Sequence, residues 1–181
     1  MKTTETPLHP PPTERLFFRT WTKNDGALAI SLWTHLEVMR HMGGVMTKDG
    51  ALQRLRREID RQEQHGIQYW PIFLREDGQF AGCSGLRLFH EDATTLELGV
   101  HLARSCWSLR LGEEAARAVI DFAFTVLDAE LLVAGHGPEN GNSQALIERL
   151  GFTYSHPSPW GEEQILHPIY RLERTAAGPK Q

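Results

Sequence analysis

The spacing of apolar residues divides this chain into a helical part and a following part that is rich in strands. After a short strand predicted at residues 16–19, apolar side chains recur every three or four positions, which is the period of an amphipathic helix. One such stretch begins after Asn24 and Asp25 and ends at the pair Gly43-Gly44, and Thr47 can cap a second. We therefore expect two consecutive helices before residue 67.

From residue 68 onward, short apolar runs bounded by turn signals predict strands. Residues 68–75, 80–88 and 95–102 form three such runs, and residues 76–78 have the sequence of a hairpin turn. Pro71 lies inside the first run, so one side of that strand should not be fully paired. The remaining pattern predicts a helix at 112–127, a strand at 131–136, a helix at 142–150, and strands at 152–155 and 169–173.

This order, β-α-α-β-β-β-α-β-α-β-β, predicts an α/β (α+β) fold with a mixed sheet and helices on its faces. The chain has no internal repeat and no interior linker. We expect one domain over residues 13–174, preceded by a disordered Pro-rich lead at 1–12 and followed by a flexible tail at 175–181.

Composition excludes several classes of protein. A net charge of -4 over 181 residues argues against a dedicated nucleic-acid surface, because phosphate binding needs a basic face. The two cysteines, Cys83 and Cys106, form no disulfide framework, and the scattered histidines predict no metal site. Without an apolar run of about 18 residues or a signal-peptide core, we expect a cytoplasmic protein that has no contact with a membrane.

Two clusters of residues are candidates for chemistry. The strand at 100–102 leads through residues 107–111 into a helix start, where unpaired N–H groups and the helix dipole attract a pyrophosphate. Asn140, Asn142 and Ser143 open a second, short helix that ends at Gly151. Each cluster taken alone is also what an ordinary strand-to-helix connection or an ordinary helix cap looks like.

The two clusters are more specific in combination with the strands before them. Those strands contain Phe80-Ala81-Gly82 with Gly85, then Leu96-Glu97-Leu98-Gly99, and the second cluster ends in Glu148-Arg149-Leu150-Gly151-Phe152. In this order the motifs resemble the GNAT acetyltransferases, and most closely their ribosomal-protein N-terminal acetyltransferase (RimJ/RimL-like) branch. The resemblance extends over residues 13–174.

The resemblance implies a fold, an activity and a co-substrate. The fold would be a central mixed, mostly antiparallel twisted sheet with helices on both faces and a splayed pair of central strands. The activity would be transfer of an acetyl group from acetyl-CoA to a primary amine, in a gap between the two splayed strands.

The resemblance also implies which residues bind the co-substrate. The main chain of Val100, His101 and Leu102 would bind the pantetheine arm, Asn140 would bind the pantetheine or the acyl end, and Ser143 would lie near the thioester sulfur. The pyrophosphate would be held by the main chain of six consecutive residues: Ser108, Leu109, Arg110, Leu111, Gly112 and Glu113.

Two positions depart from the family pattern. Arg110 stands where the phosphate loop, Q/R-x-x-G-x-G/A, has its first glycine. If the backbone there has positive φ, the arginine costs about 1 kcal/mol; alternatively it contacts a phosphate or is simply solvated. Ile147 stands where many members have a tyrosine that protonates the departing thiolate, which makes Ser143 the substitute candidate.

Three residues are candidates for the general base. Glu97 and His101 share one face of a strand if no bulge lies between them, and His136 lies near the end of the next strand. A histidine suits proton transfer at neutral pH, and burial tunes a glutamate upward. For all three the competing interpretation is a structural hydrogen bond.

The acceptor stays open between a protein N-terminus, the leading hypothesis, and a small amine. A module that binds acyl-CoA without turnover is the alternative from another class, which Arg110 and Ile147 raise. The absence of G-x-G-x-x-G and of a P-loop disfavours a nucleotide-binding domain. The sequence does not decide between a monomer and a homodimer.

Overall fold

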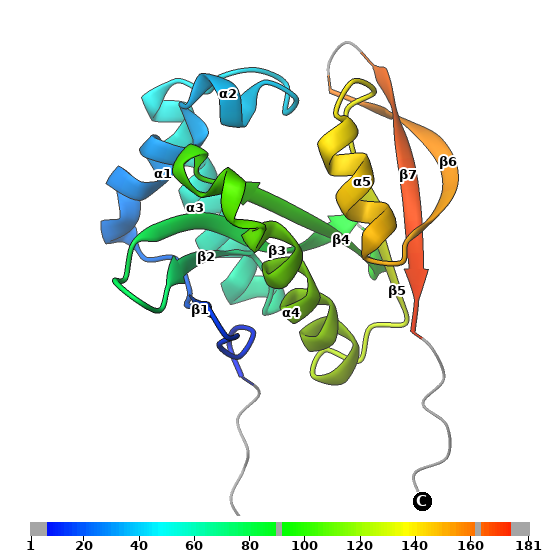
Figure 1. Ribbon diagram of the computed structural model, residues 1–181, viewed down its shortest axis with the longest axis horizontal. Coiled ribbons are helices and arrows are strands. Elements are labelled where there is room, and N and C mark those ends of the chain that lie inside the picture. The colour runs from blue at the N-terminus through cyan, green and yellow to red at the C-terminus, as the bar shows by residue number, and fades with distance from the viewer. Residues whose placement is uncertain (1–6, 90–91, 162–163, 175–181) are drawn as a thin grey trace, which may run out of the picture.

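The computed structural model describes residues 7–89, 92–161 and 164–174 of the chain. Within these ranges one seven-stranded sheet has the order β1-β2-β3-β4-β5-β7-β6, with helices on both faces (Figure 1). The strands are β1 (Leu16–Phe18), β2 (Tyr69–Leu74), β3 (Phe80–Phe89), β4 (Asp92–Leu102), β5 (Leu131–Gly135), β6 (Thr153–Trp160) and β7 (Ile165–Glu173). All neighbouring strands are antiparallel except β4 and β5.

The predicted helices form, but the first of them is divided. It consists of α1 (Gly26–Trp33) and a separate turn, α2 (Leu36–Met39), because His35 between them is extended and the Thr34 hydroxyl donates to the Ile30 carbonyl. The second predicted helix is α3 (Lys48–His65), which Thr47 caps as expected and which Gly66 ends at φ +69.

The helices divide the apolar residues between the two faces of the sheet. On one face, α1 and α3 pack over Trp21, Trp33, Tyr69 and Cys83. On the other face, α4 (Leu111–Thr125) and α5 (Gly141–Arg149) pack over the larger cluster, which includes Leu98. Figure 1 shows α4 and α5 in front of the sheet with α1 and α3 behind it. Successive side chains of β4 therefore point alternately to the face covered by α1 and α3 and to the face covered by α4 and α5.

Pairing of the outer strands confirms one prediction and corrects another. β1 is in register with residues 72–74 of β2, and beyond that stretch the Pro71 carbonyl still accepts from the Arg19 N–H at 3.4 Å; Pro71 has no N–H to give in return, so this side is incompletely paired, as expected. The last two strands were predicted too short, because β6 continues through Pro157 and Pro159 and β7 begins at Ile165. β6 is an edge strand, where a proline loses no ladder hydrogen bond.

The start of the chain is more ordered than its composition predicts. Pro10 is buried, and the Leu8 carbonyl accepts hydrogen bonds from the Trp70 indole at 3.0 Å and from Gln62 at 3.2 Å. The expected disordered lead therefore does not hold for residues 7–12, which have no helix or strand but are tied to the domain. Residues 1–6 of that lead and the predicted tail at 175–181 lie outside the described residues.

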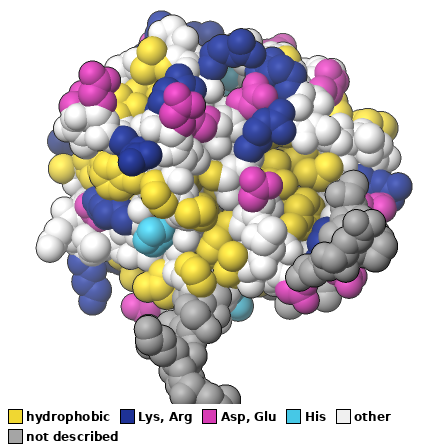
Figure 2. Space-filling model, turned by 60° about the horizontal axis from the view of Figure 1, so that its bottom comes forward, with side chains coloured by type: hydrophobic (Ala, Val, Ile, Leu, Met, Phe, Trp, Pro, Cys, Tyr) yellow, Lys and Arg dark blue, Asp and Glu magenta, His cyan; other side chains and the backbone are white. Residues whose placement is uncertain are grey.

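The surface of the described residues mixes charges. On the face seen in Figure 2, Lys and Arg side chains lie among Asp and Glu, with apolar patches between them. Within the described residues, no helix is long and apolar enough to cross a membrane. No group of three or more His, Cys, Asp or Glu side chains in these ranges is arranged to hold a metal ion.

Candidate active site at a gap between two central strands

The two central strands separate partway along the sheet. β4 and β5 pair in parallel only at Thr95–Leu131, Leu96–Leu132 and Glu97–Val133. Beyond Glu97, β4 runs on to Leu102 beside β3, while β5 continues to Gly135 beside β7. The sheet therefore contains a gap that opens from Glu97 toward the carboxyl ends of both strands, which is the splayed pair that the resemblance implied.

Alternation of hydrogen bonds along β4 determines which main-chain groups face this gap. Ala103 N–H donates to the Ala81 carbonyl at 2.9 Å, and the β3–β4 register is unbroken from Gly82–Leu102 to Leu88–Leu96. In an antiparallel ladder, alternate residues pair toward the neighbour and the others turn away. The main-chain groups of Val100 and Leu102 therefore face the gap, as expected.

The same alternation corrects one predicted contact. His101 is paired with Cys83 and directs its own main-chain groups at β3. Its backbone is consequently not free for a pantetheine arm. The Leu102 carbonyl is partly used as well, because the Trp107 indole donates to it at 3.0 Å.

The connection into α4 ends in a helix start that no side chain caps. Ser108 and Leu109 belong to a 3-10 helix, η2 (Arg104–Leu109), rather than to an open loop, so local turns engage main-chain groups there. Arg110 precedes α4 and makes no side-chain cap. The free N–H groups are therefore those of the first turn of α4, which begins Leu111-Gly112-Glu113, and an anion can bind there.

Arg110 has a left-handed backbone, with φ 56 and ψ 25, which is the condition under which the sequence implied a cost. Its side chain is 78% exposed and its guanidinium lies 3.9 Å from the Glu113 carboxylate. An exposed pair of this kind adds little to stability, so it does not offset the cost of the backbone conformation. This residue is strained at the place where a glycine is expected.

Arginines surround the acidic side chains of the first turn of α4. Glu113 accepts from Arg117 at 2.9 Å and from Arg149 at 3.4 Å, and the Arg117 hydrogen bond chiefly lowers the pKa of Glu113. Glu114 accepts from the Arg15 guanidinium at 2.6 Å. Because cations hold both carboxylates, the positive end of the helix keeps its attraction for an anion.

Gly112 faces the route from the helix start toward the gap. A Cβ added there would lie 3.4 Å from Leu102, 3.7 Å from Val100 and 3.7 Å from Leu146 of α5. These neighbours leave room for a methyl group and for little more. A large side chain at this position would enter the space between β4 and α5.

The cluster at the start of α5, formed by Asn140, Asn142 and Ser143, caps the helix and has unused hydrogen-bond donors. The Asn140 Oδ1 accepts from the Ser143 backbone N–H at 3.1 Å, which caps α5. The Asn140 amide nitrogen and the Ser143 hydroxyl have no hydrogen-bond partner among the described residues. Ile147 is 5% exposed and packs in the main core, so it offers no proton.

Glu97 and His101 lie on the same face of β4, since the register between them contains no bulge. Glu97 is held by Arg87, the residue opposite it on β3, through two hydrogen bonds of 2.9 Å and 2.7 Å. Both of its oxygens therefore engage a guanidinium, which makes it a poor base. Arg87 itself was not identified from the sequence, although its place opposite Glu97 is what a strand pair predicts.

His101 is buried and already accepts a hydrogen bond. The Trp33 indole N–H, which can only donate, points at His101 Nδ1 over 3.2 Å, so Nδ1 carries the lone pair. Burial first, and then Arg54 and Arg87, lower the pKa of His101 well below 6.5. A neutral ring whose lone pair is occupied argues against His101 as the base.

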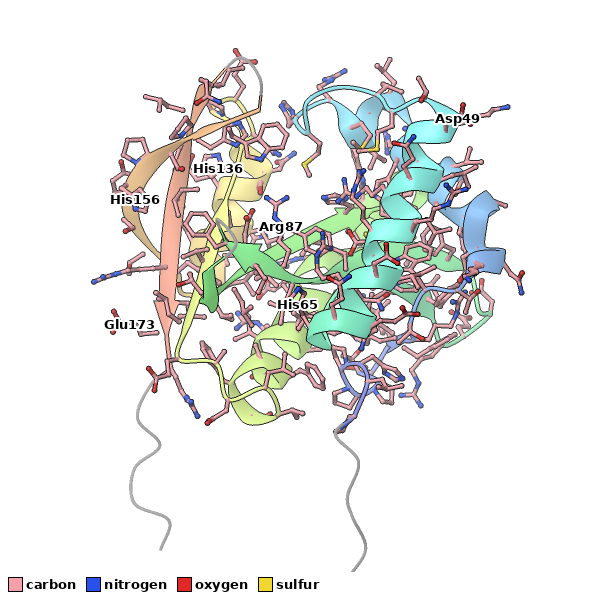
Figure 3. All side chains as sticks on the ribbon, turned by 180° about the vertical axis from the view of Figure 1, so that it is seen from behind. Asp49, His65, Arg87, His136, His156 and Glu173 are labelled. Carbon is pink, nitrogen blue, oxygen red and sulfur yellow. The ribbon has the colours of Figure 1, made fainter. Side chains whose placement is uncertain are left out.

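His136 has the opposite arrangement. Its Nδ1 lies 2.8 Å from the Gly137 carbonyl oxygen, which only accepts, so Nδ1 carries the hydrogen and Nε2 the lone pair. Nε2 lies 3.5 Å from the Tyr170 hydroxyl. Its ring partner Tyr170 belongs to the core cluster under α4 and α5. Figure 3 shows His136 on the side of the sheet that holds β5 and β7, whereas His156 lies on the outer side of β6.

Tyr69 is the residue that sequence reasoning missed. It is an aromatic residue in a buried strand, and nothing in its own neighbourhood distinguishes it from core. A Cβ added at Gly99 would overlap the Tyr69 hydroxyl, so the ring tip lies directly on β4 between Glu97 and His101. The available signal was Gly99, because a glycine inside a strand marks a close approach.

The connection between α2 and α3 crosses toward the other arm of the sheet. A Cβ at Gly43 would lie 3.1 Å from the Trp160 ring of β6, and a Cβ at Gly137 would lie 3.4 Å from the His41 carbonyl. Trp160 in turn stacks on His167 of β7 at 4.9 Å. This connection therefore bounds the α3 side of the gap.

Comparisons with known proteins agree with this geometry. The profile of a family described as an acetyltransferase (GNAT) domain matches residues 15–153. An uncharacterized N-acetyltransferase, p20, of Bacillus licheniformis is 26% identical over 142 residues, which are 77% of this chain and 80% of p20.

Solved structures have the same fold. An acetyltransferase of Agrobacterium tumefaciens is 25% identical with a TM-score of 0.78, and the alignment covers 96% of this chain and 99% of that one. RimL, a ribosomal-protein alpha-N-acetyltransferase crystallised with coenzyme A, has a TM-score of 0.75 at 14% identity, with 90% and 96% of the two chains covered.

We predict that Arg110→Gly raises the free energy of unfolding by up to about 1 kcal/mol. Glycine relieves the left-handed strain, and the larger entropy of glycine in the unfolded chain removes part of that gain. Urea unfolding measures the difference. Arg110→Ala is the matched control, since it removes the guanidinium but retains the Cβ, and a gain of equal size there would contradict the explanation.

We also predict that His101 makes the protein less stable in mild acid. The native ring stays neutral while the unfolded chain binds a proton below about pH 6.5, so stability present above that pH is lost as pH falls. The slope is at most about 1.4 kcal/mol per pH unit. Urea unfolding between pH 7 and 5 should show a smaller slope for His101→Gln and an unchanged slope for His65→Gln, whose ring is exposed.

Proposed function

Because the chain belongs to the GNAT acetyltransferase family, we propose that it transfers acetyl from acetyl-CoA to the amino terminus of a protein or peptide. The observation that carries this proposal is the gap beyond Glu97 and Val133, which meets an uncapped helix start at its α4 side. A gap that leaves main-chain groups of β4 free suits an extended amide-bearing arm, and a free helix start suits a diphosphate.

The described residues fit coenzyme A as a substrate. The pyrophosphate is assigned to the N–H groups of Leu111, Gly112 and Glu113, and the pantetheine arm to the main chain of Val100. Asn140 contributes its free amide nitrogen, and Ser143 its hydroxyl, on the α5 side of the gap. Arg110, exposed beside the same helix start, supplies a guanidinium for a phosphate.

Amine activation is assigned to His136. Of the three candidate bases its lone pair is held least firmly: the Tyr170 hydroxyl lies 3.5 Å from Nε2 and can rotate away, whereas Arg87 holds both oxygens of Glu97 and Trp33 occupies the His101 Nδ1. The pKa of His167 is lowered by burial and then by His136, with Glu97 opposing, which indicates that these groups share one neighbourhood. An amine that arrives in its neutral form can attack the thioester and lose one proton to His136 as the new bond forms.

A protein N-terminus is favoured as the acceptor because RimL, a protein of the same fold, is an alpha-N-acetyltransferase of a ribosomal protein. The connection that carries His41 and Gly43, together with Trp160 and His167, is assigned to the acceptor side. Because it leaves α2 and reaches Gly137 and Trp160 on the arm formed by β5, β7 and β6, it has the position from which to select an acceptor.

The experiment is a thiol-release assay with acetyl-CoA and a panel of peptides and small amines. We expect turnover with peptides that have a free N-terminus, and none when the same peptides are N-terminally blocked. Preference for a small amine would replace the acceptor assignment. Calorimetric binding of acetyl-CoA without thiol release for any amine would indicate a non-catalytic acyl-CoA-binding module instead.

We predict that Gly112→Leu and Asn140→Ala weaken CoA binding in calorimetry. Leucine would fill the space bounded by Val100, Leu102 and Leu146, and Asn140→Ala removes both a donor and the α5 cap. The expected rise in Kd is at least tenfold for Gly112→Leu and about fivefold for Asn140→Ala, which corresponds to roughly 1 kcal/mol. Gly141→Ala is the control, as no atom lies within 4 Å of a Cβ there, and wild-type affinity in both test variants would refute the site.

A further inference from the structure

Near the end of the β4–β5 pairing, the main chain offers very few donors to a reacting carbonyl. The N–H and C=O groups of Glu97 point at β3. The bridge between Glu97 and Val133 is therefore made by main-chain groups of its neighbours, Leu96 and Leu98. The first N–H that faces the gap and that β5 leaves free is therefore that of Val100. Because β4 has no bulge here, the next such N–H, at Leu102, lies about 7 Å farther along the strand.

A side-chain donor lies beside that N–H. Gly99, the residue before Val100, has the Tyr69 hydroxyl where its Cβ would be. This hydroxyl has no hydrogen-bond partner among the described residues. Two side-chain atoms in these ranges are both unpaired and fully buried, His35 Nδ1 and Ser84 Oγ. The Tyr69 hydroxyl is not one of them, so it retains a small contact with solvent. The phenol tip thus lies over the Cα of Gly99, next to the peptide that carries the Val100 N–H, although Tyr69 as a whole is only 3% exposed.

Tyr69 is fixed from several sides. Its backbone N–H donates to the buried Glu58 carboxylate at 2.8 Å, and its carbonyl accepts from the Trp21 indole at 2.6 Å. The ring packs edge-on against His101 with 5.5 Å between centroids. His101 is itself fixed by Trp33, and the Arg54 guanidinium lies 4.6 Å from the Trp33 ring centre and 5.8 Å from that of Tyr69.

We propose that the Tyr69 hydroxyl and the Val100 N–H together form the oxyanion site for the thioester carbonyl, an inference that rests on the proposed acetyl transfer. Both donors flank the same Gly99 Cα, so one oxygen can accept from both. Their rigid support means that they need no reorganisation during the reaction, which is the condition for strong electrostatic stabilisation.

The ionisation state of Tyr69 suits a donor. Burial raises the pKa of its phenol to about 12, with Glu97 and Glu58 adding to the rise and Arg87 and Arg54 opposing it. Tyr69 therefore keeps its proton at neutral pH. It also keeps that proton during the reaction, because an alkyl thiolate is a weaker base than a phenolate whose pKa is raised to about 12.

The chemical step balances without a change in Tyr69. The amine nitrogen bonds to the carbonyl carbon while the carbonyl π electrons move to oxygen, where the two donors stabilise the charge. The amine proton goes to His136. When the carbonyl re-forms, the C–S bond breaks, the thiolate leaves with the electron pair, and the sulfur takes a proton from water. His136 returns its proton to solvent.

The test is Tyr69→Phe, which removes the hydroxyl and keeps the ring. With acetyl-CoA and the best acceptor of the wild-type screen, we expect kcat to fall about 100-fold, which is typical for loss of one oxyanion donor. The Kd for CoA in calorimetry and the melting temperature should stay at the wild-type values. Tyr154→Phe, at a tyrosine that is 59% exposed on β6, is the matched control and should leave kcat unchanged.

Each contrary result has its own meaning. A kcat within threefold of wild type for Tyr69→Phe would overturn the oxyanion role and leave the proposed acetyl transfer standing. A loss confined to the Kd for CoA or to the melting temperature would also overturn it, in favour of a purely structural tyrosine. Absence of wild-type turnover with every acceptor would overturn the proposed function itself, and this inference with it.

Discussion

The structure depends on the point at which β4 and β5 stop pairing. Each strand keeps a partner on its other side, β3 for one and β7 for the other, so the sheet holds together while main-chain groups of β4 remain unsatisfied. Unpaired main-chain groups inside a protein are costly and usually find a partner. The gap is thus a place where an amide-bearing ligand replaces hydrogen bonds that the fold leaves out.

The two faces of the sheet carry different kinds of residues. Even-numbered residues of β4 from Leu98 onward pack under α4, where the uncapped helix start and the arginines lie. Odd-numbered residues face α1 and α3, where Glu97, Tyr69 and His101 meet. A ligand that enters from the α4 side reaches the second face only through the gap, so the geometry separates binding of a diphosphate from chemistry on an amine.

Most elements could be predicted from the sequence, because each depends on local patterns. Thr47 caps its helix and Gly151 follows the end of another, as their residue types predict, and Arg110 meets the condition of positive φ that its motif raised. Contacts between distant segments could not be predicted in the same way. The hydrogen bond from Trp33 to His101 and the ion pair of Arg87 with Glu97 join separate elements, and they changed the roles of two candidate bases. Tyr69 was missed for the same reason, since only its approach to Gly99 distinguishes it from core.

The isoleucine at position 147 no longer argues for an inactive protein. A thiolate is a far weaker base than an amine anion or an alkoxide, so the coenzyme A sulfur can leave without a dedicated strong acid, and a tyrosine at that position is not essential. The greater demands are removal of a proton from the amine and stabilisation of the carbonyl oxygen. In the proposed mechanism these demands fall to His136 and to the donors at Gly99, and Ile147 has no part in either. The buried isoleucine instead strengthens the packing of α5 on the core, which positions Asn140 and Ser143.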